Sequence, residues 1–336
     1  MEYISVIVPA YNSQDTIEQC LVAVRQSTHQ NYELIVVDNK SQDATRSIAQ
    51  KYADKVVELD GNLKRSQVRN KGIGVSRGEI IVNIDSDIII RPDTLARIVH
   101  YFSQHPHIHA VNGLLSKEHP HTGFFSQYKN LYMNYIFNRL PEKVTFLYGS
   151  IHALRRKDSQ PYDSDIEIAD DTALGQQLVG YGKQIGFIKD LEVIHLKKYG
   201  LFSFIKNDFQ IPFDWAKIFL KYKGWKQLGK NKTGFAHSPK EQLISVVLAP
   251  TIFLLSILCL LGYLSFSLIL PLILVWFIFN IRFLAFLVKE RGLLFGVLAF
   301  FVTLIDNIVM AIGILCGFAM FLYQQYANDY INKVVI

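Results

Sequence analysis

The spacing of apolar residues divides the chain into two parts. Residues 1–198 alternate short apolar runs with polar stretches, and about 200 residues can bury a full hydrophobic core. Residues 243–325 are almost continuously apolar. The pattern predicts a soluble domain followed by a membrane region, with residues 199–242 between them and a short tail at 326–336.

In the first part, β-branched apolar runs alternate with segments of helical periodicity. This alternation predicts an α/β fold in which helices cover both faces of a parallel sheet. Ligands of such sheets bind at the carboxyl ends of the strands. Pro9, Asp38 and Asp85 end three predicted strands, so we expect them to converge on one site. The predicted strands are 4–9, 33–38, 55–59 and 79–85, and the predicted helices are 16–27, 45–52 and 67–75.

The apolar part predicts three membrane spans, at 243–263, 268–288 and 293–323. Each is long enough to cross a bilayer, which takes about 20 residues. Lysines precede the first span, Lys289 and Arg291 separate the second from the third, and the loop after the first span is uncharged. By the positive-inside rule, the protein is a multi-pass protein of the cell membrane with a cytoplasmic soluble domain. Three scattered cysteines with no disulfide or zinc spacing agree with a reducing compartment.

Residues 199–242 mix aromatic side chains with lysines, and Pro212 interrupts them. This composition is typical of short amphipathic helices in the headgroup layer; a helix packed on the soluble domain is the alternative. The net charge of +6 is concentrated here, which favours a membrane surface over nucleic acid as the partner. The sequence contains no nucleic-acid-binding signature.

Two charged residues, Arg282 and Asp306, fall inside predicted spans. Charges at such depth are costly and are usually functional or paired. One interpretation is a pair between the two residues. The other is that the Arg282 side chain extends to the cytoplasmic interface.

Candidate chemistry begins with Asp85-Ser86-Asp87, directly after a predicted buried strand. Two carboxylates one residue apart can hold a hard cation such as Mg²⁺ or Mn²⁺, usually together with substrate phosphates. An ordinary turn is the alternative for an isolated triplet.

Several segments in the same order resemble the motifs of family 2 glycosyltransferases. They are Ser5–Asn12, Ile35–Asp38, Arg69–Ile73, Asp85-Ser86-Asp87 and Asp170-Asp171, and they cover about 195 residues. The resemblance implies a GT-A fold, a nucleotide-sugar donor such as a UDP- or GDP-sugar, a divalent metal ion and inversion at the sugar carbon. The chain departs from the family at Asn39 and Lys40, where small acidic and glycine residues are usual.

The resemblance also implies roles for individual residues. Asp171 is the implied catalytic base, and the N-terminus of a predicted helix, 172–179, favours its ionised form; helix capping alone is the alternative. A late histidine, His195, would complete the metal shell, unless it is structural. The implied nucleotide-binding residues are Pro9, Ala10, Asp38 and Arg69, those for metal and diphosphate are Asp85, Ser86 and Asp87, and Asp170 joins Asp171 as the catalytic pair.

Two basic clusters have open interpretations. His105, His107 and His109 alternate, which permits a zinc site but is more typical of a surface loop. Arg155-Arg156-Lys157 could contact an acceptor phosphate or form a solvated charged run.

Together these features predict transfer of one sugar to a membrane lipid, either a polyprenyl phosphate or a glycolipid hydroxyl. A non-catalytic nucleotide-binding scaffold is the alternative, and the departures at Asn39 and Lys40 are its support. A polysaccharide synthase is disfavoured because the sequence lacks the Gln-x-x-Arg-Trp motif of those enzymes.

Overall fold

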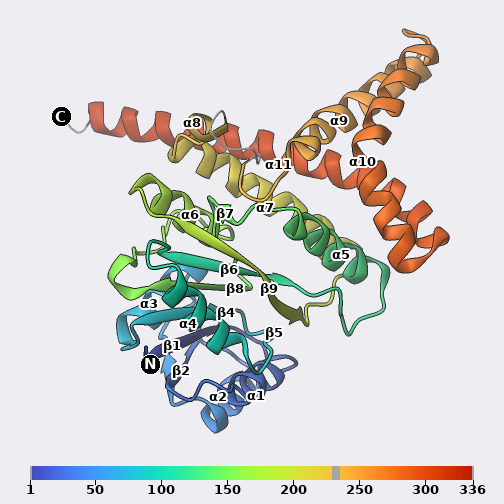
Figure 1. Ribbon diagram of the computed structural model, residues 1–336. Coiled ribbons are helices and arrows are strands. Elements are labelled where there is room, and N and C mark those ends of the chain that lie inside the picture. The colour runs from blue at the N-terminus through green and yellow to red at the C-terminus, as the bar shows by residue number, and fades with distance from the viewer. Residues whose placement is uncertain (1, 229–234, 335–336) are drawn as a thin grey trace. The chain divides into compact units, whose positions relative to one another are not determined.

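The computed structural model describes residues 2–228 and 235–334 and divides into two compact units (Figure 1). Unit 1 consists of Met1–Thr122 and Phe137–Lys198, and unit 2 of Gly123–Ile136 and Tyr199–Ile336. The predicted soluble domain, 1–198, therefore includes a segment that packs with the second unit. The predicted interfacial segment and tail include residues 229–234 and 335–336, which lie outside the described residues.

Unit 1 is built on a sheet in the order β3-β2-β1-β4-β8-β6-β9-β5, and β7 pairs with β9. The predicted strands 4–9, 33–38, 55–59 and 79–85 all form, with ends shifted by one residue at most. The strands are β1 (Ile4–Ala10), β2 (Tyr32–Asp38), β3 (Lys55–Glu58), β4 (Ile80–Ile84), β5 (Ile88–Ile89), β6 (Ala110–Leu115), β7 (Lys143–Val144), β8 (Ile151–Arg155) and β9 (Ile185–His195).

The sheet is mixed, whereas the sequence predicts a parallel one. β3, β2, β1 and β4 are parallel, but β8 lies antiparallel between β4 and β6. The chain enters β8 from the carboxyl end of β4, where the Asp85 N–H donates to the Ser150 carbonyl at 3.3 Å. A strand that starts at this edge runs back toward the start of β4.

The helices of unit 1 place apolar side chains against this sheet. Ile17, Leu21 and Val24 of α1 recur at helical spacing and are fully buried, as are Val6 and Val36 of the central strands. The unit therefore has an apolar core. Its helices are α1 (Ile17–Arg25), α2 (Thr45–Tyr52), α3 (Arg65–Val75), α4 (Thr94–Gln104) and α6 (Asp170–Gly180), with a 3₁₀ turn, η1 (Arg156–Asp158).

Unit 2 is helical, and three of its helices have the length and composition to cross a membrane: Lys240–Leu260, Phe266–Arg291 and Leu293–Ala327. Gly292, with φ +86°, makes the turn between the last two, a conformation that favours glycine. The helices are α5 (Phe124–Asn138), α7 (Leu201–Lys221), α8 (Trp225–Leu228), α9 (Lys240–Leu260), α10 (Ile269–Arg291) and α11 (Leu293–Val334), with a 3₁₀ turn, η2 (Phe266–Leu268).

The predicted interruption at Pro212 is wrong, because α7 continues through that residue. A proline inside a helix removes one backbone hydrogen bond, and here close packing on α11 holds the helix together. A Cβ atom at Gly317 of α11 would lie 2.2 Å from the Phe213 carbonyl oxygen, and one at Gly313 would lie 2.4 Å from that of Phe209. The two glycines, four residues apart, thus let α7 approach the α11 backbone closely.

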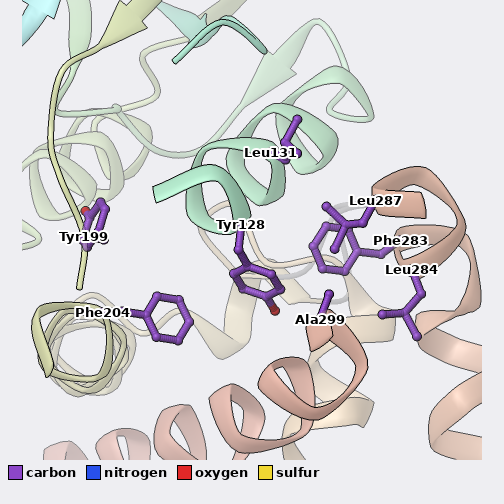
Figure 2. Packing of buried hydrophobic residues seen from close by; sticks show 8 residues of the cluster. All are labelled: Tyr128, Leu131, Tyr199, Phe204, Phe283, Leu284, Leu287 and Ala299. Carbon is purple, nitrogen blue, oxygen red and sulfur yellow. The ribbon is translucent and has the colours of Figure 1, made fainter. Parts of the chain in front are cut away.

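The core of unit 2 joins α5 to helices far along the chain (Figure 2). Tyr128 and Leu131 of α5 are buried with Phe204 of α7 and with side chains of α10 and α11. The Tyr128 hydroxyl also hydrogen-bonds Thr303 Oγ1 at 2.9 Å. The apolar face of α5 therefore explains why this segment belongs to unit 2.

Charged groups lie in the interior of the same unit. Lys129 of α5 forms an ion pair with Asp208 of α7, and Asp306 of α11 interacts with both residues. Asp306 is buried, whereas Arg282 is exposed. The interpretation that Asp306 pairs with Arg282 is thus wrong, and its actual partners lie on α5 and α7.

Candidate active site

Three neighbouring strands deliver the predicted nucleotide-binding residues to one edge of the sheet. β2, β1 and β4 are adjacent and parallel, and Ala10 is the register partner of Asp38. Pro9 and Ala10 end β1, Asp38 ends β2, and Asp85 follows β4. The topology thus brings these sequence-predicted residues to the same edge.

Asp38 and Asn39 lie at the carboxyl end of β2. Asp38 is buried; its Oδ2 accepts from the Ser41 N–H at 3.3 Å, and its Oδ1 has no hydrogen-bond partner among the described residues. The Asn39 side chain donates to the Leu63 carbonyl at 2.8 Å and accepts from the Leu63 N–H at 2.9 Å. Asn39, where the chain departs from the family pattern, therefore holds the loop at Leu63 through hydrogen bonds. Asp38 keeps its position at the end of β2.

Asp85-Ser86-Asp87 forms the turn after β4. Ser86 Oγ lies 2.9 Å from Ser13 Oγ, and Asp87 Oδ2 lies 3.4 Å from His195 Nε2. Burial acts to raise the pKa of Asp87, but His195 and the nearby Lys197 outweigh it and lower that pKa to about 2. β5 pairs with the end of β9, with Ile88 opposite His195, which explains how a distant histidine reaches this turn.

The donor atoms of this turn fit a cation that is shared with a substrate. Across residues 2–228 and 235–334, the structure contains no group of three or more His, Cys, Asp or Glu side chains that could hold a metal ion by themselves. Mg²⁺ is commonly held by one or two carboxylates and completed by substrate phosphates and water. Asp87 Oδ1, buried and without a partner in the described structure, is a free ligand atom of this kind.

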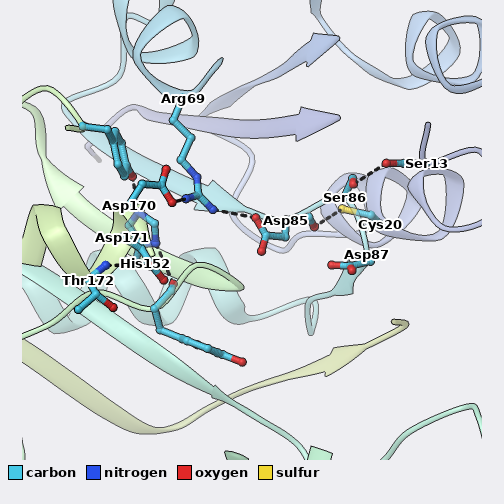
Figure 3. Close-up of polar contacts among 12 residues, drawn as sticks. Ser13, Cys20, Arg69, Asp85, Ser86, Asp87, His152, Asp170, Asp171 and Thr172 are labelled. Atoms are coloured by element: carbon cyan, nitrogen blue, oxygen red, sulfur yellow. Dashed lines mark hydrogen bonds and ion pairs between the residues drawn. The ribbon is translucent and has the colours of Figure 1, made fainter. Parts of the chain in front are cut away.

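Arg69 of α3 lies at the centre of the site (Figure 3). Its side chain is fully buried; Nη2 donates to Asp85 Oδ1 at 2.8 Å, and Nη1 donates to Asp170 Oδ1 at 2.6 Å. Arg69 is predicted to lie near the nucleotide, and in the structure it has two carboxylate partners. Asp170, predicted as part of the catalytic pair, is itself fully buried and bound to this guanidinium.

Asp171 is the second residue of α6, after Asp170, and is only partly buried. Its Oδ1 accepts from the Thr172 N–H at 2.7 Å. The N-terminal position on a helix predicts a readily ionised carboxylate. Desolvation, reinforced by the charge of Asp170, is the larger effect and raises the pKa of Asp171 to about 7.

Gly149 marks the point where these groups converge. A Cβ atom at this position would lie 3.1 Å from Asp171 Oδ2, 3.3 Å from Arg69 Nη2 and 3.5 Å from Asp85 Oδ2. Three polar groups from α3, α6 and the turn after β4 therefore surround one small volume. Glycine leaves that volume open.

Two residues of the site have no recognisable signal in the sequence. His152 of β8 lies with its Nε2 2.6 Å from the Tyr162 hydroxyl, and the Arg69 guanidinium lies over the Tyr162 ring, 5.5 Å from its centroid. Burial and the Arg69 charge lower the pKa of His152 to about 3. Both residues line the buried side of Arg69, and only the tertiary fold brings them there.

The two basic clusters take no part in this site. Arg155 pairs in register with Ile80, the first residue of β4, so it lies at the edge opposite Asp85, and it donates to the carbonyls of Ile108 and Phe102. This placement overturns its interpretation as an acceptor-phosphate contact. His105 Nδ1 lies 2.9 Å from the Tyr101 carbonyl oxygen, and His109 Nδ1 accepts from the Gln184 N–H at 3.1 Å. No zinc cluster forms among the described residues.

Known proteins share this fold and this sequence pattern. The model of the family "Glycosyl transferase family 2" matches residues 5–162, so Asp170, Asp171 and His195 lie beyond the match. The chain is 42% identical over 95 residues to EpsH of Bacillus subtilis, covering 27% of each protein. It is 37% identical over 94 residues to the glycosyltransferase AglE of Haloferax volcanii, covering 26% of this chain and 31% of AglE.

These curated relatives are thus matched over about a third of their length or less. A solved structure, the mannosyltransferase PcManGT from Pyrobaculum calidifontis, is similar over 94% of this chain and 87% of its own, with a TM-score of 0.58 and 18% identity. The sheet order, the site at its carboxyl edge and the family match agree. Residues 5–162 therefore match the glycosyl transferase family 2 model, and the chain has the GT-A fold.

Proposed function

We propose that this protein is an inverting, metal-dependent glycosyltransferase that moves one sugar from a nucleotide-sugar to a lipid in the cell membrane. The observation that carries the proposal is the convergence of Asp85, Asp171 and Arg69 around Gly149. This arrangement puts a candidate base beside the turn that would hold the diphosphate, at the edge of the sheet that Asp38 also reaches.

The donor side of the reaction needs charge neutralisation. Asp85 and Asp87 would hold Mg²⁺ or Mn²⁺ together with the donor diphosphate, and His195 would orient Asp87. The ion would stabilise the negative charge that grows on the leaving nucleoside diphosphate. The PcManGT structure is a complex with GDP-Man and Mn²⁺, which supports a GDP-sugar and Mn²⁺ as the first pair to test, ahead of UDP-sugars and Mg²⁺.

The acceptor side of the reaction needs a base if the acceptor is a hydroxyl. A pKa of about 7 for Asp171 suits a general base at neutral pH. A polyprenyl phosphate is already ionised and needs no such base. The place of Asp171 beside the turn at Asp85 therefore favours a glycolipid hydroxyl over a polyprenyl phosphate.

The lipid nature of the acceptor is inferred from unit 2. Its three long apolar helices expose residues such as Leu260 and Leu294, which suits a hydrocarbon environment. An enzyme held in the bilayer meets lipids at high local concentration. The charges between the apolar helices support a cytoplasmic location for the domain that carries the site.

Reconstituted full-length protein tests the proposal. Vesicles containing the protein would be given GDP- and UDP-sugars with Mn²⁺ or Mg²⁺, and either a glycolipid or a polyprenyl phosphate as acceptor. We expect sugar transfer to the glycolipid, loss of transfer when EDTA removes the cation, and recovery when Mn²⁺ is restored. Absence of transfer with every donor and acceptor pair, or transfer that EDTA does not reduce, would contradict the proposal.

A further inference from the structure

Arg69 joins two parts of the site that are far apart in the sequence. We propose that Arg69 is a positioning residue that fixes the distance between the turn at Asp85, where the donor diphosphate would bind, and the start of α6, which carries Asp171. The inference rests on the proposed function, because it assigns Arg69 a task within that reaction. It differs from a direct contact with the nucleotide.

The geometry of the bridge is the first support. One guanidinium binds Asp85 Oδ1 through Nη2 and Asp170 Oδ1 through Nη1 (Figure 3). Asp85 and Asp170 are 85 positions apart in the chain. Because arginine presents its donors in a rigid planar fork, one side chain can hold both carboxylates in a fixed relation.

Burial separates this role from donor binding. The side chain of Arg69 has no exposed surface, so it offers no face to a bound nucleotide-sugar. A buried guanidinium without carboxylates would be strongly unfavourable, and its two partners compensate for that cost. Asp171, next to Asp170, is partly exposed, as is Asp85, so these are the carboxylates of this group that a substrate can reach.

Arg69 is itself held in place from a second direction. Its guanidinium faces the Tyr162 ring, and the Tyr162 hydroxyl meets His152. The next residue, Asn70, fastens the same segment, since its side chain donates to the Tyr162 carbonyl at 3.0 Å and accepts from the Tyr162 N–H at 2.8 Å. Arg69 is therefore held in one position, from which it links α3, α6 and the turn after β4.

A substitution of Arg69 that keeps its positive charge tests this positioning role. Lysine keeps one positive charge but presents a single compact ammonium, so Arg69→Lys cannot hold both carboxylates in the same geometry. Misplacement of reacting groups by about 1 Å can reduce a rate about 100-fold. We therefore expect Arg69→Lys to lower kcat by about that factor while the donor KM stays close to the wild-type value.

The matched control is Arg155→Lys. Arg155 also makes several bonds and is largely buried, but it lies at the opposite edge of the sheet. We expect it to leave kcat unchanged. Hydrogen exchange supplies a readout that does not need turnover: Arg69→Lys should increase exchange in the peptide that contains Asp170 and Asp171, and Arg155→Lys should not.

The possible outcomes test the positioning role of Arg69 separately from the proposed function. A wild-type protein without transfer activity rejects the function, and the exchange experiment still decides the bridge. An Arg69→Lys protein with wild-type kcat, with its loss confined to donor KM, or with unchanged exchange at the start of α6 rejects the bridge. If Arg69→Lys does not fold, Asp170→Asn removes the ion pair between Arg69 and Asp170 and must show the same loss of kcat. Failure of both variants to fold would mean that Arg69 serves stability alone.

Discussion

Both units of this protein contain a cation that is bound to carboxylates, but the surroundings of the two cations differ. In unit 1, Arg69 binds Asp85 and Asp170, and Asp171 beside them is partly exposed. In unit 2, Lys129 pairs with Asp208 and interacts with Asp306, both of which are sealed from solvent. The first arrangement leaves a carboxylate available for chemistry, whereas the second leaves none.

The two units also differ in where their apolar side chains lie. Unit 1 has an apolar interior with Val6 and Val36 fully buried, and unit 2 exposes 76% of Leu260 and 75% of Leu294 while burying Asp208 and Asp306. An apolar exterior around an interior that includes charged residues suits lipid and not water. We infer that the carboxylates of unit 2 hold helices together, and that those of unit 1 serve the reaction.

The largest expected effect is that of Asp171→Asn. The amide cannot accept a proton, so kcat should fall about 10³-fold, within the range of a lost general base. Transfer assays on reconstituted protein measure it, and Asp190→Asn, on an exposed part of β9, is the control. Wild-type kcat in Asp171→Asn would show that the carboxylates of unit 1 are as structural as those of unit 2.

Lys129→Met should be the largest change to stability. It leaves Asp208 buried without its cation, which typically costs about 3 kcal/mol or more. Thermal unfolding followed by fluorescence measures it, with exposed Lys226→Met as the control. Adding Asp208→Leu to Lys129→Met should recover part of the loss, since the unpaired charge is then removed; a double variant no more stable than the single one would argue against this pair as a structural contact.

A smaller loss is expected from Gly317→Ala. The added Cβ would meet the Phe213 carbonyl oxygen, so α7 must move away from α11, and overpacking of this kind costs about 1–3 kcal/mol. Gly123→Ala, where a Cβ meets nothing within 4 Å, should be neutral. Equal unfolding temperatures for the two variants would show that α7 does not depend on close contact with α11.

The smallest effect is a change with pH. A base acts in its ionised form, and with a pKa of about 7 for Asp171, kcat/KM should fall tenfold for each pH unit below that value, which corresponds to about 1.4 kcal/mol. A rate that stays level down to pH 5 would exclude Asp171 as the base.

The same pKa predicts a pH-dependent stability. The folded-state pKa of Asp171 is raised above the usual aspartate value of 3.8. The stabilisation of its neutral form is therefore complete below pH 3.8 and is lost as the pH rises through about 7. Asp171→Asn should therefore unfold at a higher temperature than the wild type at pH 8, and the difference should shrink toward pH 4. A constant difference would mean that Asp171 is not the group that titrates.

The sequence predicts the elements whose signals are local. β1 ends in Pro9-Ala10, β2 ends in Asp38, and Asp85 directly follows β4, as their β-branched runs and turns indicate. The three apolar helices follow from length and composition. The break at Pro212 was predicted wrongly because helix continuity there depends on packing against Gly313 and Gly317, more than 100 residues away.

Contacts between distant residues account for the rest. The motifs name Asp85 and Asp171, but nothing local shows that Arg69 bridges Asp85 to Asp170, or that His152 and Tyr162 stand behind it. Asp306 has its partner on α7, 98 positions earlier. Such pairs are set by tertiary packing, which periodicity and composition do not report.

The place of α5 in the chain has a consequence for biosynthesis. Tyr128 and Leu131 are buried by Phe283 and its neighbours, which leave the ribosome about 150 residues later, or about 8–30 s at usual rates of synthesis. During that interval we expect the apolar face of α5 to need a chaperone or the bilayer itself for cover. A shortened gene ending at codon 198 would never supply the missing helices, so its product should aggregate instead of yielding a soluble enzyme fragment.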